Sequence, residues 1–268
     1  MNIFFMIIRK GHLMGKDDLR VAIDPILKNY QETLEMGVWI GTPTECLVDY
    51  QGQKSFSAAS ISKLVLYAYY LEQIIEKKID PQQVICVSPV DLTGGAGVIR
   101  LFPQKKGWTI SELLTAMIVV SDNTATNVLL DLVGLPTLQA WIQEPEIQFE
   151  RYMMRPIKDK ENRLTPSAAA KLLLRCVERE EAALGFSPLN QQQFQDGLAG
   201  NFAETAQPSC RIFNKTGRLD RIEHDVAYLQ ANETTIIIAA FSYDKAGSGR
   251  GISWLREIGQ TVYQQYFK

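Results

Sequence analysis

The chain has 268 residues, of which 46% are hydrophobic and 22% are charged, a composition typical of a globular protein with a sizeable core. Its 28 Lys and Arg residues and 30 Asp and Glu residues give a formal net charge of −2. This balance excludes the strongly basic character that nucleic acids and anionic membranes attract, so we expect neither as a partner.

The first 17 residues are predicted to be an extension that precedes the folded part. The apolar run at residues 3–8 is short for a secretory signal, and no basic region precedes it. Arg9 and Lys10 follow the run, which reverses the order of a secretory signal, and Met14 offers an alternative start. No run approaches the roughly 18 apolar residues of a membrane span. A cytoplasmic location is therefore expected.

A helix followed by two strands is predicted after this extension. Residues 18–35 carry the apolar stripe of a helix, in which Asp24-Pro25 either introduces a kink or marks the real start. Residues 37–40 and 46–50 read as two short strands joined by a hairpin loop.

The middle of the chain, residues 60–205, is predicted to be mostly helical. Thr109 and Glu112 have the spacing of a capping box, in which each side chain satisfies a free backbone N–H of the other. The predicted helices are residues 60–75, 109–120 and 123–133 (closed by Gly134 and Pro136), and one that opens at Thr165-Pro166.

The last part of the chain returns to strands. Residues 225–229 and 234–241 form a second predicted hairpin, and residues 252–262 carry the stripe of a final helix. We therefore predict an α+β fold, in which strands from both ends form one antiparallel sheet flanked by terminal helices. The predicted parts are an N-terminal extension (1–17), a discontinuous α/β half (18–59 and 206–268) and a helical half (60–205).

Cysteine and histidine are sparse. The four cysteines (Cys46, Cys86, Cys176 and Cys210) include no C-x-x-C pair, and there are only two histidines. We therefore expect no metal site and no cofactor. A disulfide stays open, although scattered cysteines fit small buried side chains in a reducing compartment better.

Three short motifs carry the candidate chemistry: Ser60-Ile61-Ser62-Lys63 (S-x-x-K), Ser121-Asp122-Asn123 (S-D-N) and Lys215-Thr216-Gly217 (K-T-G). Each motif alone is weak, since Ser242-Tyr243-Asp244-Lys245 also fits S-x-x-K and S-D-N is a common helix cap. All three in this order are hard to obtain by chance, and they indicate an acyl-transfer site.

The residue types suit that chemistry. A serine hydroxyl needs a base, and Lys63 lies one helical turn from Ser60 on the same face. Free N–H groups at a helix start favour a developing oxyanion. Ser121 can relay a proton to a leaving nitrogen, and Asn123 can orient Lys63 or the substrate.

The third motif supplies the binding groups. Lys215 and Thr216 can hold a substrate carboxylate, and Gly217 leaves room for a substrate along the strand. Arg218 and Arg221 either bind a substrate carboxylate or are ordinary surface arginines. Gly94–Gly97 either lines the cleft or only connects two helices.

Over residues 18–268 the chain resembles the class A β-lactamase and penicillin-binding serine hydrolase superfamily. The resemblance rests on the three motifs and on residues 56–60, 117–127 and 225–227. It implies a β-lactamase/transpeptidase-like fold, and it implies that the backbone N–H groups of Ser60 and Arg218 hold the oxyanion. It also implies a monomer that hydrolyses a small-molecule substrate, a β-lactam or a related peptide-like amide, through an acyl-enzyme.

The chain departs from this family in the loop that normally carries the glutamate that activates water for deacylation. The best register puts Met153 at that position, and Glu150 and Glu161 are the alternatives, each of which also reads as a solvated loop carboxylate. Tyr67 and Leu114 stand where some members have a disulfide. Without the glutamate we expect slow deacylation. The alternatives are a D-alanyl peptidase, an esterase-like hydrolase or a penicillin-binding sensor that acylates without turnover.

Overall fold

The computed structural model describes residues 16–204 and 208–268. The apolar run at residues 3–8 and Met14 lie outside the described residues. In the described residues, none of the helices combines the length and the apolar character that crossing a membrane requires.

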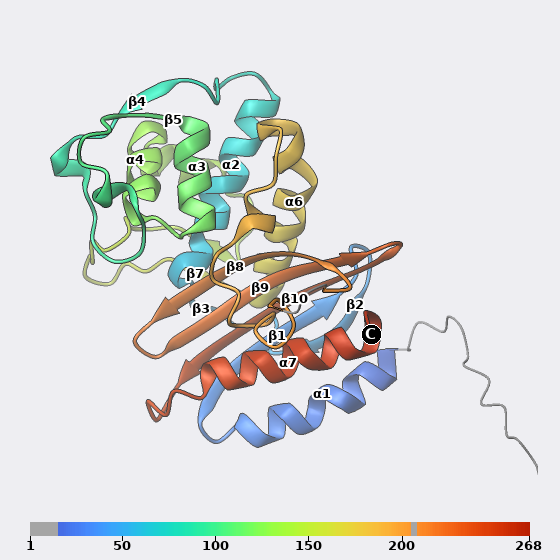
Figure 1. Ribbon diagram of the computed structural model, residues 1–268. Coiled ribbons are helices and arrows are strands. Elements are labelled where there is room, and N and C mark those ends of the chain that lie inside the picture. Colours follow the sequence, from blue (N-terminus) through green and yellow to red (C-terminus); the bar gives the residue numbers. More distant parts are fainter. Residues whose placement is uncertain (1–15, 205–207) are drawn as a thin grey trace, which may run out of the picture.

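A five-stranded antiparallel sheet is built from both ends of the described chain (Figure 1). Its order is β2-β1-β10-β9-β8, and Leu34 at the start of β1 pairs with Asp244 at the end of β10. Both predicted hairpins are therefore confirmed, and they join into one sheet. The strands are β1 (Leu34–Gly41), β2 (Cys46–Tyr50), β8 (Arg211–Leu219), β9 (Ile222–Ala231) and β10 (Thr234–Asp244).

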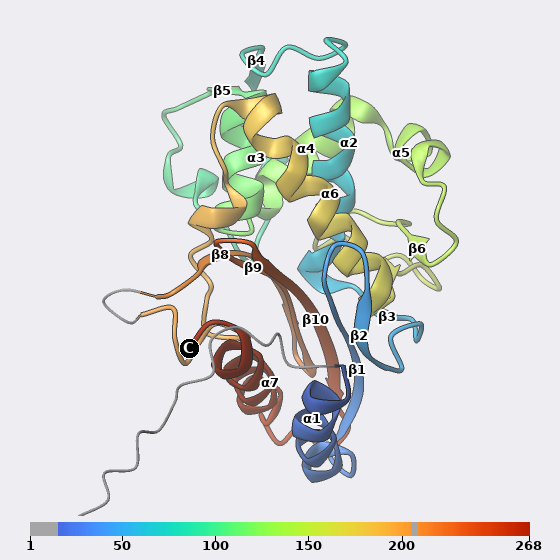
Figure 2. The same ribbon diagram turned by 90° about the vertical axis from the view of Figure 1, so that its right-hand side faces the viewer.

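Two terminal helices, α1 (Lys16–Tyr30) and α7 (Gly251–Tyr266), cover one face of this sheet (Figures 1 and 2). The predicted helix over residues 18–35 ends five residues early, because Leu34 already belongs to β1 and pairs with a strand 210 residues later in the chain. Pro25 lies inside α1 and does not mark its start.

The remaining helices form a layer on the other face of the sheet (Figure 2). The capping box is confirmed, since Thr109 Oγ1 accepts from Glu112 N (3.1 Å) and Glu112 Oε2 accepts from Thr109 N (2.9 Å). The helices are α2 (Lys63–Ile75), α3 (Ile110–Val119), α4 (Asn123–Val133), α5 (Leu135–Trp141) and α6 (Pro166–Leu184). Short strands in this layer are β3 (Phe56–Ser57), β4 (Val84–Cys86), β5 (Gly107–Thr109), β6 (Ile147–Gln148) and β7 (Arg163–Leu164).

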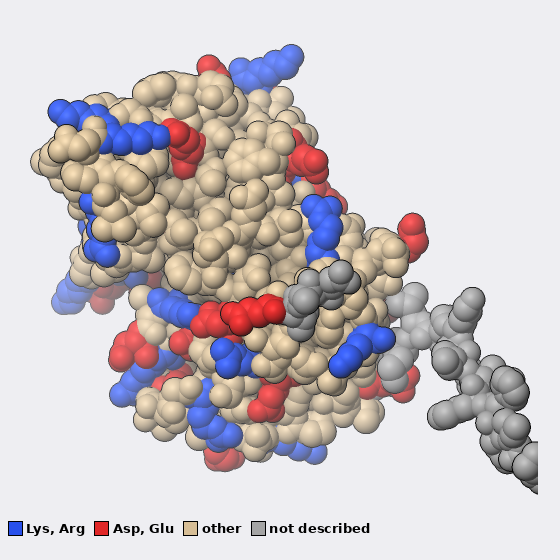
Figure 3. Space-filling view, in the orientation of Figure 1, with Lys and Arg blue, Asp and Glu red and all other residues tan. Residues whose placement is uncertain are grey.

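The sheet separates two hydrophobic cores, and the alternation of side chains along each strand assigns residues to one or the other. In β9, Val226 and Tyr228 pack in the core under the helical layer, whereas Ala227 and Leu229 pack in the core under α1 and α7. The face shown in Figure 3 intersperses acidic and basic side chains, as the near-zero net charge leads one to expect.

No disulfide joins any of the four cysteines in the described residues. Cys176 and Cys210 are buried as expected, whereas Cys86 is exposed and Cys46 is half-buried, so the expectation of burial is wrong for Cys86. Tyr67 and Leu114 are fully buried in the core of the helical layer.

Candidate active site

The nucleophile candidate stands on a short 3-10 turn, η1 (Ala59–Ser62), and not on the first turn of an α-helix as predicted. Ala59 has a φ of 46°, a left-handed conformation that an α-helix cannot contain. The turn is tied to its surroundings by Ala58 N, which donates to Asn162 O (2.7 Å). Ser60 is therefore presented at the junction between β3 and α2, half-buried and facing a cavity.

Lys63, the first residue of α2, is fully buried and reaches both hydroxyls of the motifs. Its Nζ donates to Ser60 Oγ (3.2 Å), Ser121 Oγ (3.0 Å) and Asn123 Oδ1 (2.8 Å), and it also lies 2.5 Å from Ser121 O. Burial, helped by the positive charge of Lys215, holds the Lys63 pKa well below its usual value. An amine in this state can take the proton of a serine hydroxyl.

Ser121 stands between two amines. Lys215 Nζ donates to its Oγ (3.1 Å), and Lys63 Nζ donates to the same oxygen. Ser121 has a φ of 54°, a strained conformation for a residue with a side chain. The next residue, Asp122, caps α4 by accepting from Ala125 N (2.9 Å). S-D-N therefore acts as a helix cap and as part of the site at once.

Lys215 is also fully buried, and its Nζ donates to the backbone oxygen of Thr216 (2.8 Å). Burial lowers its pKa to about 7. The structure thus brings together five residues predicted from the three motifs: Ser60, Lys63, Ser121, Asn123 and Lys215.

Gly217 lies in β8 against the turn that holds Ser60. A Cβ at this position would lie 2.9 Å from Ile61 Cγ1 and 3.1 Å from both Ala58 O and Ile61 N. A glycine is needed here so that the turn that carries Ser60 can pack closely against β8. This explanation differs from the prediction that Gly217 leaves room for the substrate.

The two arginines that follow K-T-G differ in their position relative to the cavity. Arg218 lines the cavity, but its guanidinium is paired with Asp196 (2.5 Å) and Glu223 (2.9 Å), so a substrate carboxylate would have to compete with both. Arg221 is not among the cavity-lining residues and donates to Lys245 O (3.3 Å).

The cavity in front of Ser60 has a volume of about 360 Å³. Gly95 and Ala96 line it, which settles the role of the glycine-rich segment, and Asn123 holds that segment through Gly94 O (2.9 Å) and Ala96 O (3.0 Å). The other lining residues that matter below are Arg151, Met153, Met154, Glu161 and Asn162.

Met153, the residue at the expected glutamate position, does line this cavity and is almost fully buried. Its backbone is fixed at both ends by Asn127, whose Oδ1 accepts from Met153 N (2.8 Å) and whose Nδ2 donates to Met153 O (3.0 Å). Sequence reasoning did not single out Asn127. Its position one helical turn after Asn123 was the available signal.

The two alternative carboxylates are both engaged. Glu150 is paired with Lys160 (3.0 Å) and does not line the cavity. Glu161 does line it, but it is paired with Arg151 (2.8 Å) and accepts from Asn162 N (2.9 Å). Among the residues described as lining the cavity, Glu161 is thus the one carboxylate, and an arginine neutralises it.

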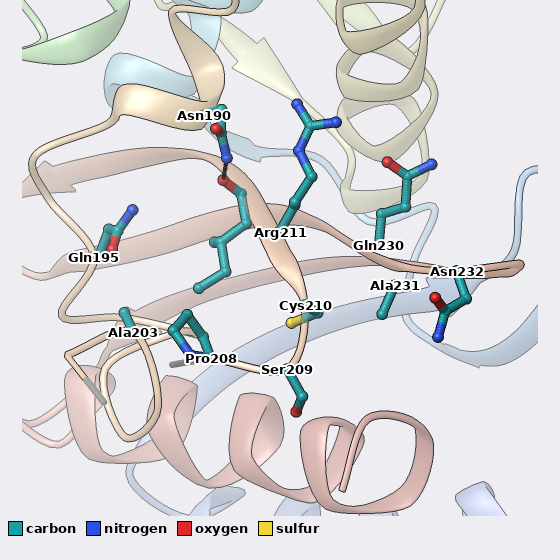
Figure 4. Close-up of a pocket in the computed structure, with 11 residues that line it drawn as sticks. Asn190, Gln195, Ala203, Pro208, Ser209, Cys210, Arg211, Gln230, Ala231 and Asn232 are labelled. Carbon is teal, nitrogen blue, oxygen red and sulfur yellow. Dashed lines mark hydrogen bonds between the residues drawn. The ribbon is translucent and has the colours of Figure 1, made fainter. Parts of the chain in front are cut away.

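A second cavity, of about 760 Å³, lies where β8 begins and β9 ends (Figure 4). It is lined by polar side chains such as Asn190, Gln230 and Asn232, and it contains none of the motif residues. Within the described part of the chain, no cluster of three or more His, Cys, Asp and Glu side chains is arranged to hold a metal ion.

Comparisons with known proteins agree with this geometry. A model of the β-lactamase enzyme family matches residues 18–266. β-Lactamase BRO-1 of Moraxella catarrhalis is 22% identical over 256 residues, which cover 89% of this chain and 82% of that protein.

Solved structures share the fold. The β-lactamase of Sphaerobacter thermophilus has a TM-score of 0.79 at 23% identity, covering 94% of this chain and 97% of that one. A point mutant of PBP-A, solved as an acyl-enzyme complex with penicillin G, has a TM-score of 0.73 at 21% identity, covering 95% of this chain and 98% of that one. The family match spans nearly the whole described fold and all three motifs, and the chain belongs to the β-lactamase enzyme family, as a β-lactamase-like serine hydrolase.

Proposed function

We propose that the protein opens a β-lactam or a related amide by acylating Ser60, and that it releases the acyl group slowly. The observation that carries the proposal is the position of Lys63 Nζ, within hydrogen-bond distance of both Ser60 Oγ and Ser121 Oγ. One amine can therefore collect the proton from the nucleophile and return it toward the leaving group.

In the proposed acylation, Ser60 Oγ bonds to the carbonyl carbon while its proton passes to Lys63 Nζ. The carbonyl oxygen becomes an oxyanion that the backbone N–H groups of Ser60 and Arg218 stabilise. When the C–N bond breaks, Ser121 gives its hydroxyl proton to the leaving nitrogen and is reprotonated by Lys63. Lys215 and Thr216 hold the substrate carboxylate, so the reacting carbonyl stays aligned with Ser60.

Slow release of the acyl group is inferred from the residues on the other side of the cavity. Hydrolysis of the acyl-enzyme needs a base beside the incoming water, and the side chain at the expected position is the thioether of Met153. Glu161 is a weak substitute because its carboxylate is already engaged by Arg151 and by Asn162 N. The structural likeness to PBP-A is compatible with a penicillin-binding role. A monomeric state and a cytoplasmic location remain predictions from the sequence.

The test is to incubate the protein with benzylpenicillin and to follow its intact mass over time, with Ser60→Ala as the control. We expect an adduct of one penicilloyl group on the wild type alone, which persists after free penicillin is removed. Rapid loss of the adduct would contradict slow release. No adduct and no hydrolysis would refute the β-lactam proposal and favour a peptide or an ester as the substrate.

A further inference from the structure

Directly behind the catalytic strand β8 lies a carboxyl group that the proposed mechanism does not use. Asp225 of β9 is fully buried, and its two oxygens are held by different elements. Oδ1 accepts from Asn214 Nδ2 (3.1 Å), and Oδ2 accepts from Leu198 N (2.9 Å). A Cβ at Gly197 would lie 2.5 Å from Oδ2, so the backbone of this loop closes over the carboxyl group.

The position of Asp225 is unfavourable for an acid. The neighbours that share its sheet face, Ala227 and Leu229, belong to the apolar core under α1 and α7. Both of its hydrogen-bond donors are neutral, and no salt bridge joins Asp225 to a cation among the described residues. A buried carboxylate without an ion pair destabilises a fold unless a nearby positive charge compensates it.

Two cations act on the charge of Asp225, first Arg218 and then Lys215. Arg218 is paired with Asp196 and Glu223, whereas Lys215 has no ion pair among the described residues. The register places Thr216 opposite Asp225 and Lys215 opposite Val226, so the lysine and the acid occupy adjacent steps of the same ladder. Lys215 Nζ turns toward Ser121 in the helical layer, while Asp225 faces the loop under α7. Lys215 is itself buried, and its hydrogen-bond partners, Ser121 Oγ and Thr216 O, are neutral acceptors.

The electrostatics agree with this pairing. Burial lowers the pKa of Lys215 to about 7, and the charge of Asp225 acts against that fall by raising it. Burial raises the pKa of Asp225 to about 7, and the positive charges of Arg218 and Lys215 are among the influences that lower it. Lys215 and Asp225 therefore favour the charged form of each other across the low-dielectric sheet.

We propose that Asp225 is a positioning residue for Lys215: its buried carboxylate, on the far face of the β8–β9 ladder, keeps Lys215 as the ammonium that binds the anionic group of the substrate. The role of Lys215 as a substrate-binding group rests on the proposed function. The electrostatic coupling between Lys215 and Asp225 does not depend on that function.

Among the other charged groups near the pair, Arg218 acts on both, because its positive charge lowers the pKa of Lys215 and the pKa of Asp225. Arg218 of β8 is paired with Asp196 and with Glu223 of β9, and Arg256 of α7 donates to Asp196 O (2.9 Å). On the helical side, the nearby Lys63 is an amine whose pKa the positive charge of Lys215 lowers, so it offers Lys215 no compensating negative charge. Asp122, beside Ser121, is a second buried acid without an ion pair in the described part of the chain; its carboxylate accepts from Val98 N, Ile99 N and Ala125 N, and its charge acts on Lys63. Asp225 is the acid whose charge raises the pKa of Lys215.

The first experiment needs no substrate. Lysine and aspartate are labelled with ¹³C in the full chain, and the resonances of Lys215 Cε and Asp225 Cγ are followed from pH 5 to pH 10. In the wild type we expect the two groups to perturb each other, so that each shows two titration steps at shared midpoints. Independent single-step curves would overturn the inference, whatever the fate of the β-lactam proposal.

The second experiment compares wild type with Asp225→Asn. Asn214 now presents its Nδ2 to Asp225, and if its amide turns over, the new amide can donate to Asn214 Oδ1, which has no hydrogen-bond partner within the described residues. We therefore expect the variant to fold. Loss of the negative charge lowers the pKa of Lys215, so the ammonium is lost at lower pH. If that shift is about one unit, acylation by benzylpenicillin falls about tenfold at pH 8 and about twofold at pH 6.

The controls separate charge from damage to the fold. Glu35→Gln removes a half-buried carboxylate, paired with Lys54, from the same sheet and leaves the pH profile unchanged. Acylation by a neutral activated ester, which has no anionic group, does not show the loss at pH 8. An equal loss at every pH, or an equal loss with the neutral ester, would show that Asp225 has only a structural role. If Asp225→Asn does not fold, the titration of the wild type still decides.

Discussion

The two walls of the Ser60 cavity are built from different chemistry. On one side, Ser60 and Asn123 line the cavity, and hydrogen bonds join them to three further residues, Lys63, Ser121 and Lys215. These five residues, with their two buried amines, are here called the motif wall. The facing wall, here called the loop wall, is the segment 149–162. It presents Met153 to the cavity, and its one described lining carboxylate is paired with an arginine.

This difference separates the two halves of a hydrolytic cycle. Acylation needs a nucleophile, a base and a proton donor for the leaving group, and the motif wall provides all three. Release of the acyl group needs a base for water on the other side of the ester, and the loop wall offers a thioether there. In the mechanism that we propose, the protein is therefore equipped for the first step and poorly equipped for the second.

The largest expected effect comes from removing the base of the motif wall. Lys63→Met should lower the acylation rate by about 10³, because a serine without a positioned base is a poor nucleophile. The measurement is the rate of adduct formation with benzylpenicillin by intact mass. Lys245→Met is a matched control, since Lys245 closes the second S-x-x-K sequence but donates to Gln31 O at the surface. A Lys63→Met variant that acylates at the wild-type rate would place the base elsewhere.

The second prediction concerns a carboxylate added to the loop wall. Met153→Glu should speed up deacylation by about 10² or more, since a positioned general base contributes about 10²–10⁴. The half-life of the pre-formed acyl-enzyme measures this directly. Met153→Gln has the same length without a basic carboxylate and should release the acyl group as slowly as the wild type. Equal acceleration by both variants would mean that lost packing, not a base, admits water.

A smaller effect is expected where the motif wall meets the sheet. Gly217→Ala pushes a methyl group against Ile61 and Ala58, which should displace the Ser60 turn, lower acylation about tenfold and destabilise the fold by about 1–3 kcal/mol. Gly94→Ala is the control beside the same cavity, because a Cβ there meets no atom within 4 Å. Thermal unfolding and acylation rates are measured on both. Wild-type acylation by Gly217→Ala would show that the contact is not needed to hold the nucleophile.

The smallest expected effect tests the carboxylate of the loop wall. Glu161→Gln should change the deacylation rate less than about threefold, because a carboxylate held by Arg151 contributes little as a base. A loss of about 10² or more in deacylation would instead identify Glu161 as the base that replaces the missing glutamate. Acylation rates measured in parallel show whether the loop still closes the cavity.

Much of this arrangement can be predicted from the sequence, because the motifs are local. Hairpins, caps and the S-x-x-K spacing depend on neighbouring residues, and they place the five polar groups of the motif wall correctly. The predicted end of α1 is wrong because β1 gains its pairing from β10, far along the chain. The predicted start of α2 is wrong because Ala59 takes a left-handed conformation that no propensity rule assigns to alanine.

The rest of the site depends on contacts between distant segments. Nothing near Gly217 in the sequence indicates that Ile61 will pack against it, and nothing near Arg218 indicates Asp196. The burial of Asp225 cannot be predicted either, since it depends on the loop at Leu198, a distant segment whose backbone N–H donates to the carboxyl group.

The pairing of β1 with β10 also governs when the site can exist. A ribosome delivers Ser60, Lys63 and Ser121 long before it delivers β10, so a nascent chain holds most of the reactive groups without the strand that aligns them. Because contacts of such large sequence separation form late and at a cost in chain entropy, reactivity toward acylating compounds should arise in one step, only after the polypeptide has been made through β10.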